Sequence, residues 1–177
     1  MKYLLTGEHT ERLNFRLVTL EDFELWLPLF EEEHVAKFLG IDQNLSPFEQ
    51  CEFWFNKVFH RYDNGLGGMN ALIDKNTGEF IGQCGLLVQT VDEEERLEIG
   101  YSICPKHWKK GYALEAAIKC KNYCFEHEFT DNLMSMMHID NIGSELVARR
   151  NGMTFEKQVK SFYVFSISKA QWESQKE

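Results

Sequence analysis

Several hallmarks of secreted and membrane-spanning proteins are missing from this sequence. The 177 residues contain five cysteines, an odd number, with no repeated C-x-x-C spacing. That usage argues against a disulfide framework and favours a reducing, cytoplasmic environment. No apolar run approaches the ~20 residues that cross a bilayer. Residues 1–9 hold only a short apolar patch, so we expect no signal peptide and no membrane partner.

Positive charge is also scarce. The net charge of −9 disfavours nucleic acid as a partner. Residues 1–100 contain 19 acidic and 8 basic side chains, a net charge of −11, whereas residues 101–177 contain 9 and 11, a net charge of +2. An anionic ligand is therefore better accommodated by the second part of the chain.

Common catalytic and metal-binding signatures are absent or weak. Neither phosphate-loop pattern, G-x-x-x-x-G-K-[ST] or G-x-G-x-x-G, occurs, and the G-x-S-x-G of serine hydrolases is missing. Cys120, Cys124 and His127 share one helix face, as metal ligands can. That face is apolar, where reduced cysteine packs as a small hydrophobe, so we expect no metal site. His138 ends an apolar strand and is expected to be structural.

The pattern of apolar residues predicts an α/β protein with one domain over residues 1–177. Seven runs have strand character: 12–18, 70–74, 80–91, 96–103, 133–139, 154–160 and 162–168. Four runs have helix character: 20–39, re-started or kinked at Pro28, 47–62 after the capping box of Ser46 and Glu49, about 112–125, and 141–151. The order predicts a mixed sheet of six or seven strands with helices on both faces.

The stretch from Pro105 to Ala116 joins a predicted strand to a predicted helix. It reads Pro-Lys-His-Trp-Lys-Lys-Gly-Tyr-Ala-Leu-Glu-Ala. The first N–H groups of a helix lack intrahelical partners, and the helix dipole is positive there, so this junction can bind an anion. Gly111 would let the backbone approach the ligand closely. An ordinary connection with a solvated basic loop is the alternative.

A second stretch, from His138 to Met153, makes it possible to interpret the first. Together the two resemble the GNAT family of acetyl-CoA-dependent N-acetyltransferases. The first resembles the family's Q/R-x-x-G-x-G/A loop, with Trp108 at the Q/R position. Its Trp-x-Lys-Gly-Tyr-Ala-x-Glu-Ala form looks most like the RimJ/RimL branch, which acetylates protein N-termini. The second resembles the Asn-x-x-Ala/Ser-x-x-x-Tyr-x-x-x-Gly-Phe motif, through Asn141, Ser144 and Gly152.

The resemblance covers residues 11–167 and implies a mostly antiparallel sheet whose central strands, through Ile99 and Met136, splay apart. It also implies that acetyl-CoA lies in the wedge between them. The residues it assigns to cofactor binding are Ile103, Trp108, Lys109, Lys110, Gly111, Tyr112, Ala113, Asn141 and Ser144. Trp108 is expected to form an aromatic wall, and Asn141 can equally be a helix cap.

Acetyl transfer to an amine needs a group that removes the amine proton. Glu98 is the candidate base, because it alternates with Leu97 and Ile99 in its strand and the family often carries an acidic residue near this place. The alternative is a surface carboxylate paired with Arg96. The family's tyrosine acid falls on Ala148 here, a departure that leaves Ser144 as the candidate partner for the departing thiolate.

Two weaker hydroxyl candidates for that thiolate are Tyr101 and Tyr112. The expected reaction is direct attack by a primary amine in a ternary complex. The acceptor is expected to be a protein N-terminal amine, with a small polyamine or amino sugar as the alternative, and the acidic first part of the chain is expected to attract a cationic acceptor. A GNAT-like module that binds CoA without catalysis is the competing function. Monomer and homodimer both remain open.

Overall fold

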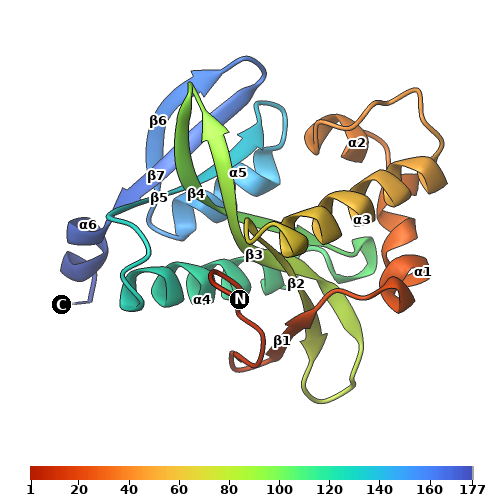
Figure 1. The fold of residues 1–177 in the computed structure, drawn as a ribbon, viewed down its shortest axis with the longest axis horizontal. Coiled ribbons are helices and arrows are strands. Elements are labelled where there is room, and N and C mark those ends of the chain that lie inside the picture. The colour runs from red at the N-terminus through yellow and green to blue at the C-terminus, as the bar shows by residue number, and fades with distance from the viewer. Residues whose placement is uncertain (177) are drawn as a thin grey trace.

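A computed structural model describes residues 1–176 and shows one seven-stranded sheet with helices on both faces (Figure 1). The strand order is β1-β2-β3-β4-β5-β7-β6, and every neighbouring pair is antiparallel except β4 and β5. The strands are β1 (Leu13–Leu17), β2 (Gly67–Asp74), β3 (Phe80–Val91), β4 (Glu94–Ile103), β5 (Asn132–His138), β6 (Thr154–Val159) and β7 (Phe162–Ser168). The predicted fold class and all seven predicted strands are confirmed.

The helices are α1 (Phe23–Trp26), α2 (Val35–Phe38), α3 (Pro47–Asp63), α4 (Tyr112–Glu126), α5 (Ile142–Arg150) and α6 (Lys169–Ser174). Of these, α3, α4 and α5 lie where the sequence placed them. The predicted capping box before α3 is present, because the Ser46 hydroxyl accepts from the Glu49 N–H and Glu49 accepts from the Ser46 N–H. No helix within residues 1–176 is long and apolar enough to cross a membrane.

The helix predicted over residues 20–39 is interrupted near Pro28, as expected, but it is also broken at further places. The segment is divided into α1, α2 and two 3-10 turns, η1 (Leu20–Asp22) and η2 (Leu27–Glu31). Pro28 opens η2, and His34 adopts a left-handed conformation with φ 72° before α2. The short helix α6 was not predicted, although its Ser168 and Gln171 form a capping box.

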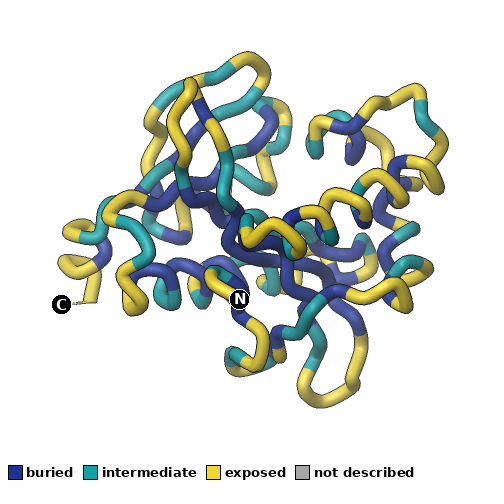
Figure 2. The backbone as a smooth tube through the Cα atoms, viewed as in Figure 1, coloured by how far each residue is buried: buried dark blue, intermediate teal, exposed yellow. Residues whose placement is uncertain are grey.

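Two apolar layers cover the sheet. On one face, α4 packs its Ala116, Ala117, Cys120 and Cys124 against the strands in the largest core cluster. On the other face, α1, η2 and α3 bury Trp26, Phe30 and Phe55 in a second cluster. Figure 2 shows this as buried residues along the central strands, with exposed residues on the outer helix faces and hairpin tips.

The centre of the sheet is opened between β4 and β5. Their parallel pairing has only two registered pairs, Leu97 with Leu133 and Glu98 with Met134. Two side-chain contacts follow: the Ser135 hydroxyl donates to the Ile99 carbonyl at 3.0 Å, and the Glu98 carboxylate accepts from the Met136 N–H at 3.4 Å. Beyond these contacts the two strands separate, as the family resemblance implied, and the gap leads into the cavity described next.

Candidate active site

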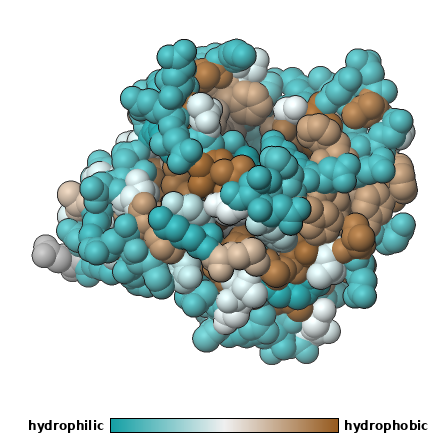
Figure 3. Space-filling view, in the orientation of Figure 1, coloured by the Kyte–Doolittle hydropathy of each residue, from teal (hydrophilic) through white to brown (hydrophobic). Residues whose placement is uncertain are grey.

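A cavity of about 340 Å³ lies at the opening between β4 and β5. Residues of the α2 region, α3, α5 and strands β2 to β5 line it, together with Phe162 at the start of β7. The face of the molecule seen in Figure 3 has hydrophobic residues gathered at its centre and hydrophilic residues around them. The cavity therefore has a sheltered interior in the part of the sheet that lacks interstrand hydrogen bonds.

Glu98 is buried in this cavity, with 7% of its surface exposed. One carboxylate oxygen accepts from Gln89 Nε2 at 2.8 Å, and the other accepts from the Met136 N–H of β5 at 3.4 Å. Burial raises the pKa of Glu98, and these two hydrogen bonds oppose the shift. A carboxylate with a raised pKa that faces a cavity is suited to accept a proton from a bound ligand.

The alternative role for Glu98, a surface pair with Arg96, is wrong. Arg96 instead forms a bidentate pair with Glu156 of β6 at 2.8 and 2.9 Å. Glu98 lies on the opposite face of β4 from Leu97 and Ile99, as alternation predicted, because both of those residues belong to the core beneath α4.

The sequence analysis missed a hydrogen-bonded chain that ends at Glu98. Arg61 of α3 donates to the Gln89 side-chain oxygen at 3.0 Å and to the Val88 carbonyl at 2.8 Å, and Gln89 in turn donates to Glu98. Arg61 is itself buried, with 8% of its surface exposed. The helical spacing of Trp54, Lys57, Val58 and Arg61, all of which line the cavity, is the sequence signal that could have revealed this face.

The charge inside the cavity differs from the expectation of an acidic acceptor cleft. Among the described residues, the charged side chains that line it are Lys57, Arg61 and Glu98. The acidic runs at residues 31–33 and 93–95 are exposed and do not line the cavity. The net charge of residues 1–100 therefore does not describe the local site.

The predicted anion-binding loop follows the separating end of β4. A 3-10 turn, η3 (Pro105–His107), leads to Trp108, and α4 begins after Gly111. The Trp108 indole donates to the Ile103 carbonyl at 2.7 Å, so its ring folds back onto the end of β4. Gly111 is the N-cap, has φ 82° and caps no N–H with a side chain, which leaves the first turn of α4 open to an anion.

The N-terminal segment braces this loop. Arg12 donates from Nε to Glu115 of α4 at 2.6 Å and from a terminal nitrogen to the Lys110 carbonyl at 2.9 Å. Its guanidinium also lies over the Tyr112 ring, 4.1 Å from the centroid. Lys109 and Lys110 are exposed, so the loop presents cations to solvent. The contacts of Arg12 hold the loop backbone in place.

The start of α5 lies beside the same end of β4. Asn141 caps α5 by accepting from the Ser144 N–H at 3.2 Å, so its predicted structural role is confirmed. Ser144 and Tyr101 both line the cavity, and the Tyr101 hydroxyl donates to the Ser144 carbonyl at 2.7 Å. Burial raises the pKa of Tyr101. Ala148 is buried in the core under α5.

The remaining predicted residues lie away from the cavity. The Tyr112 hydroxyl donates to Asp74 at 3.3 Å in the β2–β3 hairpin, so it is a poor candidate for the thiolate partner. Cys120 is buried with its sulfur 3.5 Å from that of Cys84, whereas His127 is exposed at the end of α4. His138 is buried between the rings of Phe38 and Phe162, which agrees with a structural role.

Comparison with known proteins identifies the family. Residues 12–154 match the acetyltransferase (GNAT) domain model. The chain belongs to the GNAT acetyltransferase family. It is 37% identical to the uncharacterized protein YkkB of Bacillus subtilis, over 86% of this chain and 88% of that protein. It is 30% identical to the uncharacterized N-acetyltransferase p20 of Bacillus licheniformis, over 85% and 82% of the two chains. This GNAT enzyme is therefore an acetyltransferase.

Solved structures share the fold. An acetyltransferase from Agrobacterium tumefaciens superposes with a TM-score of 0.76 at 23% identity, covering 94% of this chain and 96% of that one. A spermidine N-acetyltransferase from Vibrio cholerae, in complex with CoA and spermine, gives 0.68 at 16% identity over 92% and 98%. RimL, a ribosomal L7/L12 α-N-protein acetyltransferase in complex with CoA, gives 0.67 at 15% identity over 92% and 97%.

Proposed function

We propose that this GNAT enzyme transfers acetyl from acetyl-CoA directly to a primary amine in a ternary complex, with Glu98 as the general base. The observation that carries the proposal is the position of the buried Glu98 carboxylate, which faces the cavity at the point where β4 and β5 separate. An acceptor amine in the cavity must lose a proton before it attacks, and a carboxylate with a raised pKa can accept it.

The cofactor side of the site fits acetyl-CoA. Gly111 at the N-cap has space around it, the nearest atom to an added Cβ being Arg12 Nη2 at 3.5 Å. The uncapped first turn of α4 and the exposed Lys109 and Lys110 would hold phosphates. Ile103, Trp108, Tyr112 and Ala113 would form the walls of this part of the site, and Asn141 and Ser144 at the start of α5 would border the pantetheine arm.

Bound acetyl-CoA supplies an activated thioester. The protein's part is to bring the amine to that thioester, to exclude water and to move protons. Glu98 would take the amine proton, held in place by Gln89 and the Met136 N–H. The Ser144 hydroxyl is the proposed donor to the departing thiolate. Tyr101 is the second candidate because it lines the same cavity, and its hydroxyl would have to turn away from the Ser144 carbonyl to which it donates.

The acceptor class follows from the loop sequence. The Trp108–Ala116 segment resembles the RimJ/RimL branch, which supports an α-amine, as in a peptide or protein N-terminus. The similarity of fold to RimL is in keeping with that choice, and the similarity to a spermidine acetyltransferase keeps a small polyamine as the alternative. The free thiols of five buried cysteines support a cytoplasmic location.

The test is release of CoA thiol from acetyl-CoA in the presence of a panel of peptides, amino acids, polyamines and amino sugars. Wild-type protein should release thiol with at least one primary amine, and mass spectrometry of the acceptor should show one added acetyl group. Saturating acetyl-CoA binding without thiol release for any amine would instead support a CoA-binding module that lacks catalysis.

A further inference from the structure

The cavity holds a cation that the proposed mechanism does not use. Lys57 lies one helical turn before Arg61 on α3, and both line the cavity together with Glu98. Arg61 is occupied, because it donates to the Val88 carbonyl and to Gln89. Within residues 1–176, the Lys57 ammonium has no hydrogen bond or ion pair with another side chain. Lys57 is thus the cation of the cavity that a ligand can engage.

The surroundings of Lys57 also differ from those of an ordinary surface lysine. The residue as a whole is exposed, yet desolvation of its ammonium and the neighbouring Arg61 lower the pKa of Lys57, while Glu98 opposes this. Leu39, Met69, Leu87 and Met136 give the cavity much of its remaining wall, so few other groups there would orient a polar ligand. An anionic group on the ligand would gain most from pairing with Lys57.

Building on the proposed acetyl transfer, and in place of the peptide or protein N-terminus that the loop sequence favours, we infer that the acceptor is a small amine that also carries a carboxylate, as a free amino acid does. Lys57 is then its specificity residue. The amine would lie at Glu98 and the carboxylate at Lys57, so each charged group of the ligand meets its opposite. A second ammonium group, as in a polyamine, would instead be added to a cavity that already holds Lys57 and Arg61.

Size favours a small acceptor over a long peptide. The cavity volume of about 340 Å³ lies at the lower end for ligand pockets, which span roughly 300–1,000 Å³. Phe38 and Leu39 of the α2 region form part of its wall, and Lys37 beside them is paired with Asp140 at the start of α5, at 2.7 Å. This ion pair joins α2 to the segment before α5, and α2 and α5 contribute Phe38 and Ser144 to the cavity wall.

The experiment compares proteinogenic amino acids with their carboxamides, which keep the α-amine and lose the negative charge. We expect the wild type to have a higher kcat/KM for the acid than for the matching amide. Lys57→Met should lower this acid-to-amide ratio roughly 10- to 100-fold, the usual effect of removing a charged hydrogen-bond partner. Lys57→Glu should reverse the preference toward amines with a second cationic group.

Two controls make the result specific. Lys169→Met removes a lysine that pairs with Glu128 at 2.9 Å outside the cavity, and it should leave the ratio unchanged. The second control uses peptides that begin with Asp or Asn. A peptide with Asp as its first residue also carries an amine close to a carboxylate, so it could satisfy Lys57 in place of a free amino acid. Turnover of Asp-initiated peptides above free amino acids would assign the carboxylate to a peptide and overturn the small-molecule acceptor.

Two other results would overturn the role of Lys57. One is a wild-type acid-to-amide ratio near one, and the other is a Lys57→Met variant that loses acid and amide turnover in parallel, since Lys57 would then act only through Glu98. Calorimetric titration of the protein–CoA complex separates this inference from the catalytic proposal. Preferential binding of acids over amides without any thiol release would refute catalysis and support carboxylate recognition. Equal turnover of amides and acids would support catalysis and refute carboxylate recognition.

Discussion

The Gln89 side chain donates a 2.8 Å hydrogen bond to Glu98, and the two residues come from adjacent strands of the sheet. Through Gln89, Glu98 is connected to Arg61 on α3, a helix that is far away in the sequence. The base of the proposed reaction is therefore positioned by the packing of α3 on β3. Changes to Gln89 or Arg61 should therefore alter the pKa of Glu98, although neither residue takes a proton in the proposed reaction.

The first prediction concerns Glu98 itself. Glu98→Gln should lower kcat by roughly 10²–10⁴-fold, because the proton acceptor is lost while the shape of the side chain is kept. The dissociation constant of acetyl-CoA, measured by calorimetry, should stay near the wild-type value. Full activity of this variant across the pH range would assign deprotonation to water or to another residue.

Glu98 should also make stability depend on pH. Burial raises the pKa of Glu98 above its value in the unfolded chain, so ionisation of this carboxyl opposes folding. The penalty is absent below the unfolded pKa and develops as the pH rises through the folded pKa. Glu98→Gln should therefore gain free energy of unfolding over the wild type at neutral pH and lose that advantage in acid, as measured by urea unfolding. An equal difference at both pH values would contradict this.

The third prediction tests the connection through Gln89. Gln89→Leu removes a hydrogen bond that lowers the pKa of Glu98, so that pKa should rise further and the acidic limb of kcat/KM should move to higher pH. Gln83→Leu is the matched control, since Gln83 is a buried glutamine of β3 that accepts from Trp54 and does not contact Glu98. If the acidic limb of kcat/KM lies at the same pH in both variants, Gln89 does not affect the pKa of Glu98.

Gly111 allows a matched test of the cofactor loop. Gly111→Val should abolish most of the rise in melting temperature caused by acetyl-CoA, since a side chain at φ 82° strains the N-cap and covers the first turn of α4. Gly78→Val, in the β2–β3 hairpin at φ 73°, should carry a similar backbone cost and keep the ligand effect. For a ligand at about 100 times its dissociation constant, that effect is ~2.7 kcal/mol. Retention of the full shift by Gly111→Val would place the cofactor elsewhere.

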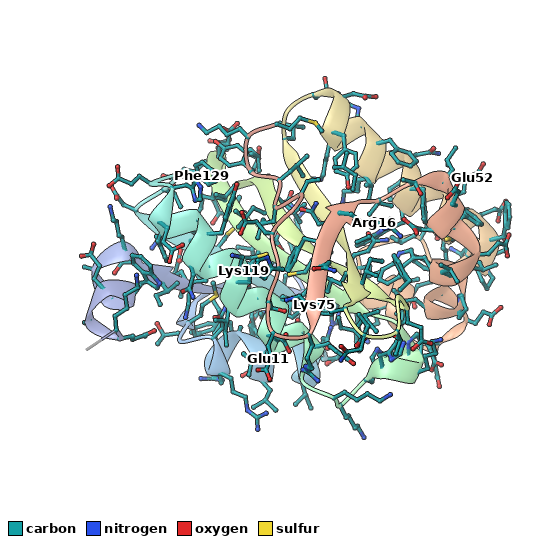
Figure 4. All side chains as sticks on the ribbon, turned by 90° about the horizontal axis from the view of Figure 1, so that it is seen from below. Glu11, Arg16, Glu52, Lys75, Lys119 and Phe129 are labelled. Atoms are coloured by element: carbon teal, nitrogen blue, oxygen red, sulfur yellow. The ribbon has the colours of Figure 1, made fainter. Side chains whose placement is uncertain are left out.

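Arg12 should matter for binding through the loop it braces. Arg12→Met removes the contacts with Glu115 and the Lys110 carbonyl, and we expect acetyl-CoA affinity to weaken about tenfold, the effect of one charged hydrogen bond. Lys119→Met is the control, because Lys119 of α4 also holds the N-terminal segment, through Glu8 at 2.6 Å, but lies outside the loop (Figure 4). Equal affinities in the two variants, by calorimetry, would refute the bracing role.

Much of the fold was predictable because its signals are local. Strand β3 has the predicted bounds, and the face of β4 on which Glu98 lies follows from simple alternation. The capping of α3 by Ser46 and of α5 by Asn141 likewise depends on residues three positions apart. The short helices and 3-10 turns between residues 20 and 39 were harder to predict, because the left-handed conformation of His34 has no signature in the sequence.

The polar contacts of the site were less accessible. Gln89 and Arg61 could be connected to Glu98 only with the strand register and the rotation of α3 known, and lysine or arginine on a helix is usually solvated. Trp108 donates to a carbonyl five residues earlier, a contact that depends on how η3 turns the chain. The positions of the proposed catalytic groups were thus predictable, whereas their neighbours were not.

Because β4 and β5 share only two registered pairs, the sheet consists of two parts that are weakly joined. Strands β1 to β4 form one hydrogen-bonded ribbon and β5, β7 and β6 form another, joined along a seam of Leu97, Glu98, Leu133 and Met134. Backbone amides on either side of that seam have few partners to protect them, so they should exchange hydrogen sooner than amides in the centre of each ribbon. The two ribbons can then shift slightly against each other. Bound ligands would in that case determine the width of the gap between β4 and β5.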